Sequence, residues 1–334
     1  PQSHMDSQHA IEIQGLCKRF GPKVAVDHLD MVLPTGKLYG LIGPNGAGKT
    51  TSIRMILSII FPDAGRLSVL GKASASESKD RIGYLPEERG VYRKMKVKAF
   101  LSYMATLKGV RDPKIGTKID EWLDRVGLAD VAKKRCEELS KGMQQKVQFI
   151  ATVIHDPELL ILDEPFSGLD PVNLRLLRDL IKEQHAMGKT VIFSTHVMHH
   201  AEQICDHIVM INGGKKVLDA DLPTIRASYP IRSLLIDPLD TGADLGPLDD
   251  LPFVVGRTRE ETAWELTLDG RIDPTEALRT CASTIPLARV ELRRPTLEDV
   301  FIEKATSEGT DEAELREALR VPDAGGIEAE GVTS

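Results

Sequence analysis

Apolar and polar residues alternate with two different periods along the first 220 residues. Short apolar runs predict buried strands, because each run ends in glycine, acidic or polar residues before it reaches helical length. These runs lie at 38–43, 159–163, 190–195 and 207–211. Between them, apolar residues recur about every three or four positions, which is typical of amphipathic helices. Strands that alternate with helices predict an α/β fold with a parallel sheet covered on both faces.

Three further segments have a clear pattern. Residues 10–33 alternate apolar and polar positions around a turn at 21–23, which predicts a β-hairpin. The run 51–60 has helical spacing and stops before Pro62, so a helix is expected directly after the first buried strand. Residues 95–135 have helical spacing throughout and predict a helical insert over about 90–138.

The pattern changes near a turn at 212–216, and residues 225–305 are expected to form a separate small α+β domain. One helix in it is predicted from Asp273, which is followed by proline and then by glutamate. A second helix is predicted from the capping box of Thr296 and Asp299. Strands are expected at 231–236, 252–257, 263–268 and 287–292.

The two ends of the chain differ from these domains. Residues 1–4 precede Met5 and are interpreted as a cloning scar. From Thr306 the chain is rich in Glu and Asp and contains no aromatic residue. Residues 306–334 are therefore expected to be an acidic, partly disordered tail.

Composition narrows the classes of function. With 41% hydrophobic and 28% charged residues, the chain has the make-up of a soluble globular protein. Its net charge of −7 argues against nucleic-acid binding, which usually needs a basic face. No stretch approaches about 18 consecutive apolar residues, so no membrane-spanning helix is expected. The four cysteines are scattered and form no CxxC pair, which is typical of reduced thiols in the cytosol and does not indicate a disulfide or zinc framework.

The sequence GPNGAGKT (43–50) matches the phosphate-loop pattern G-x-x-x-x-G-K-[ST]. Its glycines let backbone N–H groups wrap around phosphates, and the following helix adds its positive end. Lys49 is expected to reach the β- and γ-phosphates of ATP, and the Thr50 hydroxyl to bind Mg²⁺. The predicted nucleotide-binding residues are Gly43, Pro44, Asn45, Gly46, Ala47, Gly48, Lys49, Thr50 and Thr51.

Two acidic residues supply the second half of this predicted site. They end the buried strand of LLILDEP (159–165). Asp163 is expected to hold Mg²⁺ through water, and Glu164 to polarise the water that attacks the γ-phosphate.

Three motifs stand in order along the chain: GPNGAGKT (43–50), LSKGMQQK (139–146) and LLILDEP (159–165). In this order they closely resemble the ATP-binding cassette (ABC) family. FSGLD (166–170) and FSTH (193–196) continue the resemblance.

The resemblance covers about residues 10–220, which are therefore taken as an ABC nucleotide-binding domain. It implies a P-loop core with a mixed sheet, an N-terminal β-hairpin subdomain and a helical insert. It also implies that the ring of Phe20 stacks on adenine.

ABC ATPases form head-to-tail dimers that hold two ATP molecules. The resemblance implies that the Ser140 hydroxyl and the Gly142 N–H contact the γ-phosphate of ATP bound by a second copy of the chain. The usual family form is LSGGQ, and here Lys141 and Met143 replace its Gly and Gln. The alternative is an ordinary helix N-cap at Ser140, which would not need the glycine.

Two more site residues come from the resemblance. Asp170 is implied to touch the neighbouring subunit and to help place the catalytic groups. His196 is implied to hydrogen-bond the γ-phosphate. The spacing of His196 and His200 also suggests a metal site, but the sequence shows no third ligand.

Glu87 marks a departure from the family pattern, which usually has a Gln whose amide oxygen reaches Mg²⁺. A carboxylate also binds this ion, so Glu87 is a candidate metal ligand. The alternative is a solvated charged turn, for which Glu88 and Arg89 are the better candidates.

PEERG (86–90), LSKGMQQK (139–146) and a trailing domain that ends in RPTLEDVF (294–301) resemble the ATPase subunits of bacterial exporters for sodium, drugs or other small solutes. This implies an ATP-hydrolysing motor that drives a separate transmembrane permease. It also implies a cytoplasmic location, peripheral on the inner face of the cell membrane.

Two alternative functions are less consistent with the sequence. A soluble ABC ATPase that acts on ribosomes or DNA is disfavoured by the single cassette and the acidic charge. In a P-loop kinase, LSKGMQQK and FSGLD would have no role. The C-terminal domain suits dimerisation, sensing or permease docking, and dimerisation is favoured because a permanent contact raises the effective concentration of the two cassettes.

Overall fold

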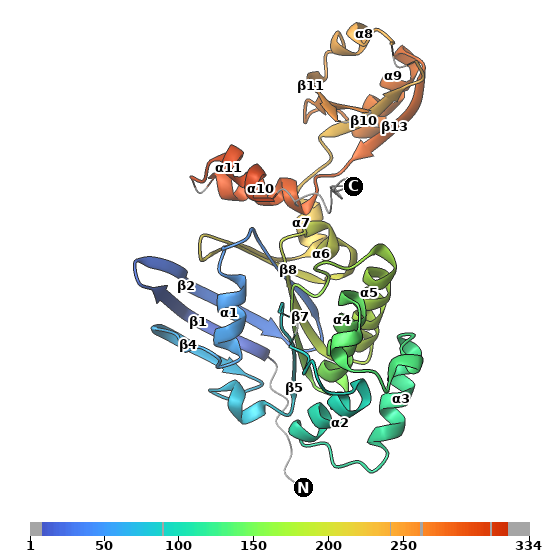
Figure 1. The fold of residues 1–334 in the computed structure, drawn as a ribbon. Helices are drawn as coiled ribbons and strands as arrows, with labels where there is room; N and C mark the ends of the chain where they lie inside the picture. The colour runs from blue at the N-terminus through green and yellow to red at the C-terminus, as the bar shows by residue number, and fades with distance from the viewer. Residues whose placement is uncertain (1–8, 89, 241, 261–262, 308, 320–334) are drawn as a thin grey trace, which may run out of the picture. The chain divides into compact units, whose positions relative to one another are not determined.

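The computed structural model describes residues 9–319 apart from 89, 241, 261–262 and 308 (Figure 1). The chain divides into two compact units. The first contains the residues up to Ala220 and those from Lys304 onward, and the second contains Asp221–Glu303. The division lies shortly after the turn at 212–216, where the sequence pattern changes.

The first unit is built on a six-stranded sheet. In order across the sheet, its strands are β5 (Ile82–Leu85), β6 (Leu159–Asp163), β7 (Thr190–Thr195), β3 (Leu38–Ile42), β8 (His207–Asn212) and β9 (Lys215–Asp221). Neighbours among the first five strands pair in parallel. Every residue of β3, β6 and β7 is buried, which confirms the predicted parallel sheet with two covered faces.

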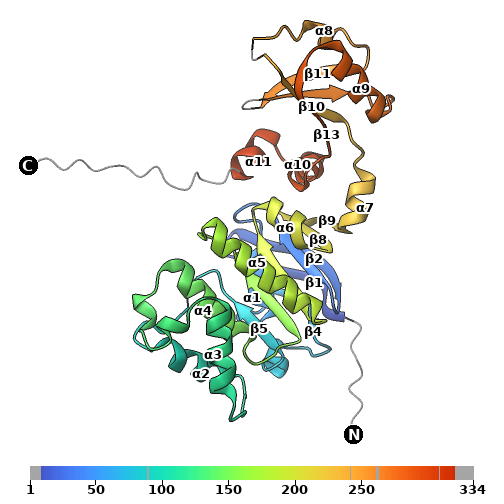
Figure 2. The same ribbon diagram turned by 90° about the vertical axis from the view of Figure 1, so that its right-hand side faces the viewer.

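Different elements cover the two faces of this sheet (Figures 1 and 2). One face is covered by α1 (Lys49–Ile56) and a three-stranded sheet, in which β1 (His9–Phe20) lies between β2 (Lys23–Pro34) and β4 (Ala64–Val69). Strands β1 and β2 form the predicted hairpin. The helices α4 (Lys141–Val153), α5 (Pro171–Ala186) and α6 (Met198–Ile204) pack against β5, β7 and β3.

The helices near residues 50 and 100 are shorter than their apolar patterns predict. Helix α1 ends at Ile56, and Ser58 then adopts a left-handed backbone with φ 57°. The insert contains α2 (Val97–Leu107) and α3 (Ile115–Arg125) in place of one continuous helical stretch. Gly109 separates them with φ 81°, a conformation that L side chains rarely adopt. Short 3₁₀ turns follow at Ala129–Val131 and Cys136–Glu138.

The second unit is an α+β domain with its own core. Its antiparallel sheet has the order β11 (Val254–Glu260), β12 (Ala263–Leu268), β10 (Ser233–Pro238) and β13 (Leu287–Arg293). Its helices α7 (Leu222–Ser228), α8 (Gly246–Asp249) and α9 (Pro274–Thr284) are followed by α10 (Leu297–Ser307). Asp273 caps α9, and the backbone N–H groups of Thr296 and Asp299 donate to each other's side chains, as the capping box requires.

The expected acidic tail begins with more helix than its composition suggests. Helix α10 continues to Ser307, and α11 (Glu312–Leu319) follows with Leu315 and Leu319 buried. Residues 320–334, like residues 1–4 interpreted as a cloning scar, lie outside the described residues. Within the described ranges, no helix combines the length and the apolar character that crossing a membrane requires.

Candidate active site

The parallel sheet brings three predicted site segments to one edge. Strands β6, β7 and β3 are neighbours, and they pair so that Asp163 lies opposite Ser194 and Ile42 opposite Thr195. The phosphate loop, the two acids and His196 therefore start from adjacent strand ends. Ligands of open α/β sheets bind at this carboxyl edge.

The phosphate loop is held in a conformation that only glycine fits at two positions. A Cβ atom on Gly43 would lie 2.1 Å from the Ile211 carbonyl oxygen, and one on Gly48 would lie 2.4 Å from that of Ala25. Gly48 is left-handed with φ 109° and caps α1, which begins at Lys49. The loop thus presents backbone N–H groups at a helix N-terminus, the usual arrangement for binding phosphate.

Lys49 is buried, with 6% of its surface exposed, and it lies between the loop and the acids. Its Nζ donates to the carbonyl oxygens of Gly43 at 2.7 Å and Pro44 at 3.0 Å. The same atom lies 4.0 Å from Glu164 Oε1. Burial lowers the pKa of Lys49, and the charge of Glu164 opposes this shift.

Asp163 has one satisfied and one unsatisfied carboxylate oxygen. Its Oδ1 accepts hydrogen bonds from Ser194 Oγ at 2.5 Å and from Thr50 Oγ1 at 3.3 Å. Its Oδ2 is buried and has no hydrogen-bond partner among the described residues. Burial raises the pKa of Asp163, because the charged form loses hydration. An unsatisfied carboxylate oxygen beside a threonine hydroxyl fits the oxygen ligands that Mg²⁺ prefers.

Glu164 is fixed by its backbone and by a histidine. Its φ of 45° is left-handed, and its N–H donates to Ser194 Oγ at 3.1 Å. Its Oε1 lies 2.9 Å from His196 Nδ1. The carboxylate is therefore aimed by a neighbouring strand end rather than left to rotate freely.

Of these groups, Lys49, Thr50 and Glu164 line a pocket of about 260 Å³. Phe20, which is half exposed, lies at its rim, and Lys18 Nζ lies 5.5 Å from the centre of the Phe20 ring. Glu87 reaches the same pocket, and burial followed by the charges of Asp163 and Glu164 raises its pKa. The lining residues are Phe20, Lys23, Ala25, Asn45, Gly46, Gly48, Lys49, Thr50, Thr51, Glu87 and Glu164.

Three predicted site residues lie elsewhere in the first unit. Ser140 caps α4, and its Oγ accepts a hydrogen bond from Met143 N–H at 3.3 Å. Asp170 caps α5 and accepts from the N–H groups of Val172 and Asn173. Near these caps, a Cβ atom on Gly142 would lie 3.0 Å from Asn173 Nδ2. The described residues that line the pocket include none of Ser140, Gly142 and Asp170.

Sequence reasoning missed the role of Ser194. Its hydroxyl donates to Asp163 and accepts from Glu164, so it joins the two acids to the next strand. Its place in FSTH (193–196), two residues before His196, was a signal, but the contact depends on the register between β6 and β7.

The alternative metal site at His196 and His200 finds no support among the described residues. The group of metal-ligating side chains found there contains neither histidine. The ring of His200 instead packs on Phe166, with 5.0 Å between the ring centres.

Two protein-family models match the chain. The model described as "ABC transporter" matches residues 26–167. The model described as "ATP-binding protein DrrA1-3-like, C-terminal domain" matches residues 221–305, which include the whole of the second compact unit.

Individual relatives match over most of their length. The uncharacterized ABC transporter ATP-binding protein YhaQ of Bacillus subtilis (strain 168) is 40% identical over 301 residues, which cover 88% of this chain and 98% of YhaQ. Nod factor export ATP-binding protein I of Sinorhizobium fredii (strain NBRC 101917 / NGR234) is 33% identical over 310 residues, which cover 90% of this chain and 87% of that protein. A solved ATP-binding subunit of an ABC transporter superposes with a TM-score of 0.61 and 28% identity, over 66% of this chain and 92% of its own.

The hydrogen bonds of Ser194 predict that Ser194→Ala destabilises the first unit. Asp163 loses a partner, and a hydrogen bond to a charged group contributes about 1.5–3 kcal/mol. We expect the free energy of unfolding to fall by about this amount, measured by fluorescence during urea unfolding in a Trp264→Phe background, in which the buried Trp122 is the remaining tryptophan. Ser102→Ala on α2 is the control. Equal stability of the two variants would contradict the role of Ser194.

Proposed function

The chain belongs to the family of ABC transporter ATP-binding proteins, and we propose on this basis that it is the ATP-hydrolysing motor subunit of an exporter with a separate permease. The observation that carries the proposal is the meeting of Lys49, Asp163, Glu164 and His196 at one sheet edge. The name of the Sinorhizobium relative, a Nod factor export protein, supports the direction of transport.

In this proposal, Lys49 and the loop N–H groups bind the phosphates of ATP. Lys49 Nζ already lies at the loop, where the carbonyl oxygens of Gly43 and Pro44 hold it. Phosphate oxygens replace these neutral acceptors with charged ones, which make stronger hydrogen bonds. Phe20 at the rim offers its exposed ring to the adenine.

Glu164 acts on the attacking water. It accepts a proton from the water as the oxygen approaches the γ-phosphate in line with the leaving group. His196, 2.9 Å from Glu164 Oε1, holds the carboxylate and hydrogen-bonds the γ-phosphate as the reaction proceeds.

Thr50, Asp163 and Glu87 are the residues that would hold Mg²⁺. The unsatisfied Oδ2 of Asp163 is the strongest indication, since a buried carboxylate oxygen is costly without a partner. When bound, Mg²⁺ neutralises charge on the β- and γ-phosphates.

Ser140 and Gly142 serve the ATP of a second copy in this proposal, and Asp170 contacts that copy. The first N–H groups of a helix have no intrahelical acceptor, so the start of α4 can bind an anion. The lining of the described pocket contains neither Ser140 nor Gly142, so the proposal assigns them to the ATP of the other copy. The permease then converts closure and opening of the dimer into transport. We propose that the permease holds the motor at the membrane. We also propose that the second compact unit contributes to the contact between the two copies of the dimer.

Replacement of the proposed base tests the hydrolysis step. Glu164→Gln should lower kcat for ATP by about 10²–10⁴, because the base is lost while the loop is kept. ATP affinity should stay within a few-fold of the parent, measured by equilibrium binding. With hydrolysis blocked, the variant should also dimerise when ATP is added, measured by analytical ultracentrifugation. Glu121→Gln, an exposed change on α3, is the control. Near-normal turnover in Glu164→Gln would overturn the assignment.

Mixing two inactive variants tests the head-to-tail arrangement. Ser140→Arg should block hydrolysis but leave ATP bound to its own phosphate loop. Lys49→Ala should weaken the binding of ATP to the phosphate loop. A mixed dimer has one intact site, built from the loop of the first variant and α4 of the second. We expect ATPase activity to return on mixing, whereas Ser140→Thr keeps the hydroxyl and should remain active alone. Loss of ATP binding by the isolated Ser140→Arg chain would favour the plain N-cap.

Glu87→Gln tests the proposed metal contact. The variant should retain ATPase activity, because an amide oxygen also binds Mg²⁺. The Mg²⁺ concentration for half-maximal activity should change, because one negative charge leaves the pocket that also holds Glu164. Glu88→Gln, on an exposed neighbour, is the control. An unchanged Mg²⁺ profile in Glu87→Gln would argue against metal contact.

A further inference from the structure

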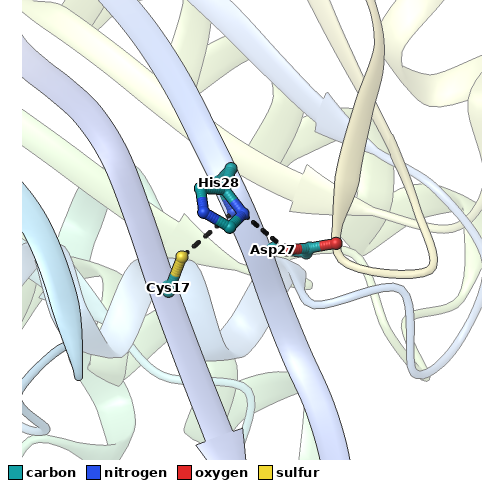
Figure 3. Close-up of side chains that lie close together, drawn as sticks. All are labelled: Cys17, Asp27 and His28. Atoms are coloured by element: carbon teal, nitrogen blue, oxygen red, sulfur yellow. Dashed lines mark hydrogen bonds and ion pairs between the residues drawn. The ribbon is translucent and has the colours of Figure 1, made fainter.

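A bulge in the β1–β2 hairpin gathers three side chains that can bind a metal. Leu16 pairs with Leu29 and Lys18 pairs with Val26, so Cys17 on β1 lies opposite two residues of β2. These residues are Asp27 and His28, and Figure 3 shows their side chains beside Cys17. Such bulges re-aim side chains in a strand pair.

The bulge has a defined geometry. His28 is left-handed with φ 49°, and its backbone N–H donates to Cys17 Sγ at 3.3 Å. Its Nδ1 lies 2.7 Å from Asp27 Oδ1. One ligand atom from each of the three residues lies within 4.8 Å of the other two. A tetrahedral ion with bonds of about 2.0–2.3 Å needs its ligands about 3.3–3.8 Å apart, so small side-chain rotations complete the set.

The surroundings leave room for an ion and its water. Cys17 and Asp27 are half-buried and His28 is exposed. Asp27 and His28 line an open hollow together with Asp30, Lys215 and Lys216. Lys215 Nζ lies 3.5 Å from Asp27 Oδ2. The hydrogen bond with His28 lowers the pKa of Asp27.

The thiol distinguishes this cluster from other histidine–carboxylate pairs of the chain. His9 pairs with Glu12, and His207 with Asp219, and neither pair appears with a cysteine in the metal-ligating group found among the described residues. The remaining cysteines, Cys136, Cys205 and Cys281, are buried.

We propose that Cys17, Asp27 and His28 bind one Zn²⁺-class divalent ion, with water in the remaining position. Thiolate, imidazole and carboxylate together suit a borderline-soft cation such as Zn²⁺ and disfavour Mg²⁺. The thiol releases its proton to solvent as the sulfur–metal bond forms. The proposal is independent of ATP hydrolysis, because none of the three residues lines the described nucleotide pocket.

Two backbone hydrogen bonds connect the proposed ion site to the phosphate loop. The N–H of Asp27 donates to the Gly214 carbonyl at 3.0 Å, and the N–H of Gly214 donates to the Ala47 carbonyl at 2.9 Å. An ion held by Cys17 of β1 and by Asp27 and His28 of β2 would therefore link these strands beside the hydrogen bonds that connect β2 to the phosphate loop.

Titration with Co²⁺ tests the site on the full chain without nucleotide, in a thiol-free reductant and excess Mg²⁺. We expect one Co²⁺ per chain, a thiolate-to-metal charge-transfer absorption, and displacement by Zn²⁺. Cys17→Ser should abolish the absorption. His28→Asn should weaken Co²⁺ binding at least about tenfold, since even outer-shell changes cost about 10–100-fold in metal affinity. Asn is the chosen replacement because it tolerates a left-handed backbone.

His9→Ala is the matched control, since it removes a β1 histidine that pairs with a carboxylate outside the cluster. It should bind Co²⁺ like the parent. Absence of the charge-transfer absorption in the parent would overturn the proposal. So would unchanged Co²⁺ affinity in either Cys17→Ser or His28→Asn, with circular dichroism used to verify that each variant is folded.

Discussion

The buried negative charge at the carboxyl edge of the parallel sheet is the constraint on which the rest of the site depends. Asp163 ends β6, Glu164 follows it directly, and Glu87 follows β5, the neighbouring strand. Burial raises the pKa of Asp163, so its ionised form costs folding free energy that the protonated form does not. This cost develops as pH rises through the unfolded and then the folded pKa. Lys49, held between loop and acids, offsets part of it. A divalent cation bound as proposed would add further positive charge beside these carboxylates.

The features of this site that could be predicted are those that depend on residues close together in the sequence. Strand, glycine loop and helix follow one another from Leu38 to Ile56, and the acids directly end a buried run, so neither needed long-range information. The role of Ser194 could not be predicted from local sequence, because its partner Asp163 is 31 residues away and the contact follows from strand register. The bulge at Cys17 was missed for a related reason: alternation identifies strands, but it does not show where two residues oppose one. The helical insert was predicted as continuous because its apolar residues have helical spacing on both sides of Gly109. That spacing does not show the left-handed backbone of Gly109, which separates α2 from α3.

The start of α4 reconciles two interpretations that looked exclusive in the sequence. Ser140 is an N-cap, since its Oγ accepts the N–H of Met143. A hydroxyl has one donor as well as two acceptor positions, so capping leaves its O–H available for a phosphate oxygen. The cap therefore orients the hydroxyl rather than competing with the proposed trans contact. Glycine suits position 142 for a different reason, because the nearby Asn173 amide leaves little space there for a side chain.

Ligand chemistry separates the two proposed cation sites of the first unit. The sheet edge offers Thr50, Asp163 and Glu87, all oxygen donors, which suit a hard ion such as Mg²⁺. The hairpin bulge offers the sulfur of Cys17 and the imidazole of His28, which a hard ion binds poorly. Excess Mg²⁺ should therefore occupy the first site without filling the second. The two sites are nevertheless connected through β2, because Ala25 lines the nucleotide pocket and Asp27 belongs to the bulge. An ion at the bulge would act on ATP binding only through this strand, by restraining its position against the phosphate loop.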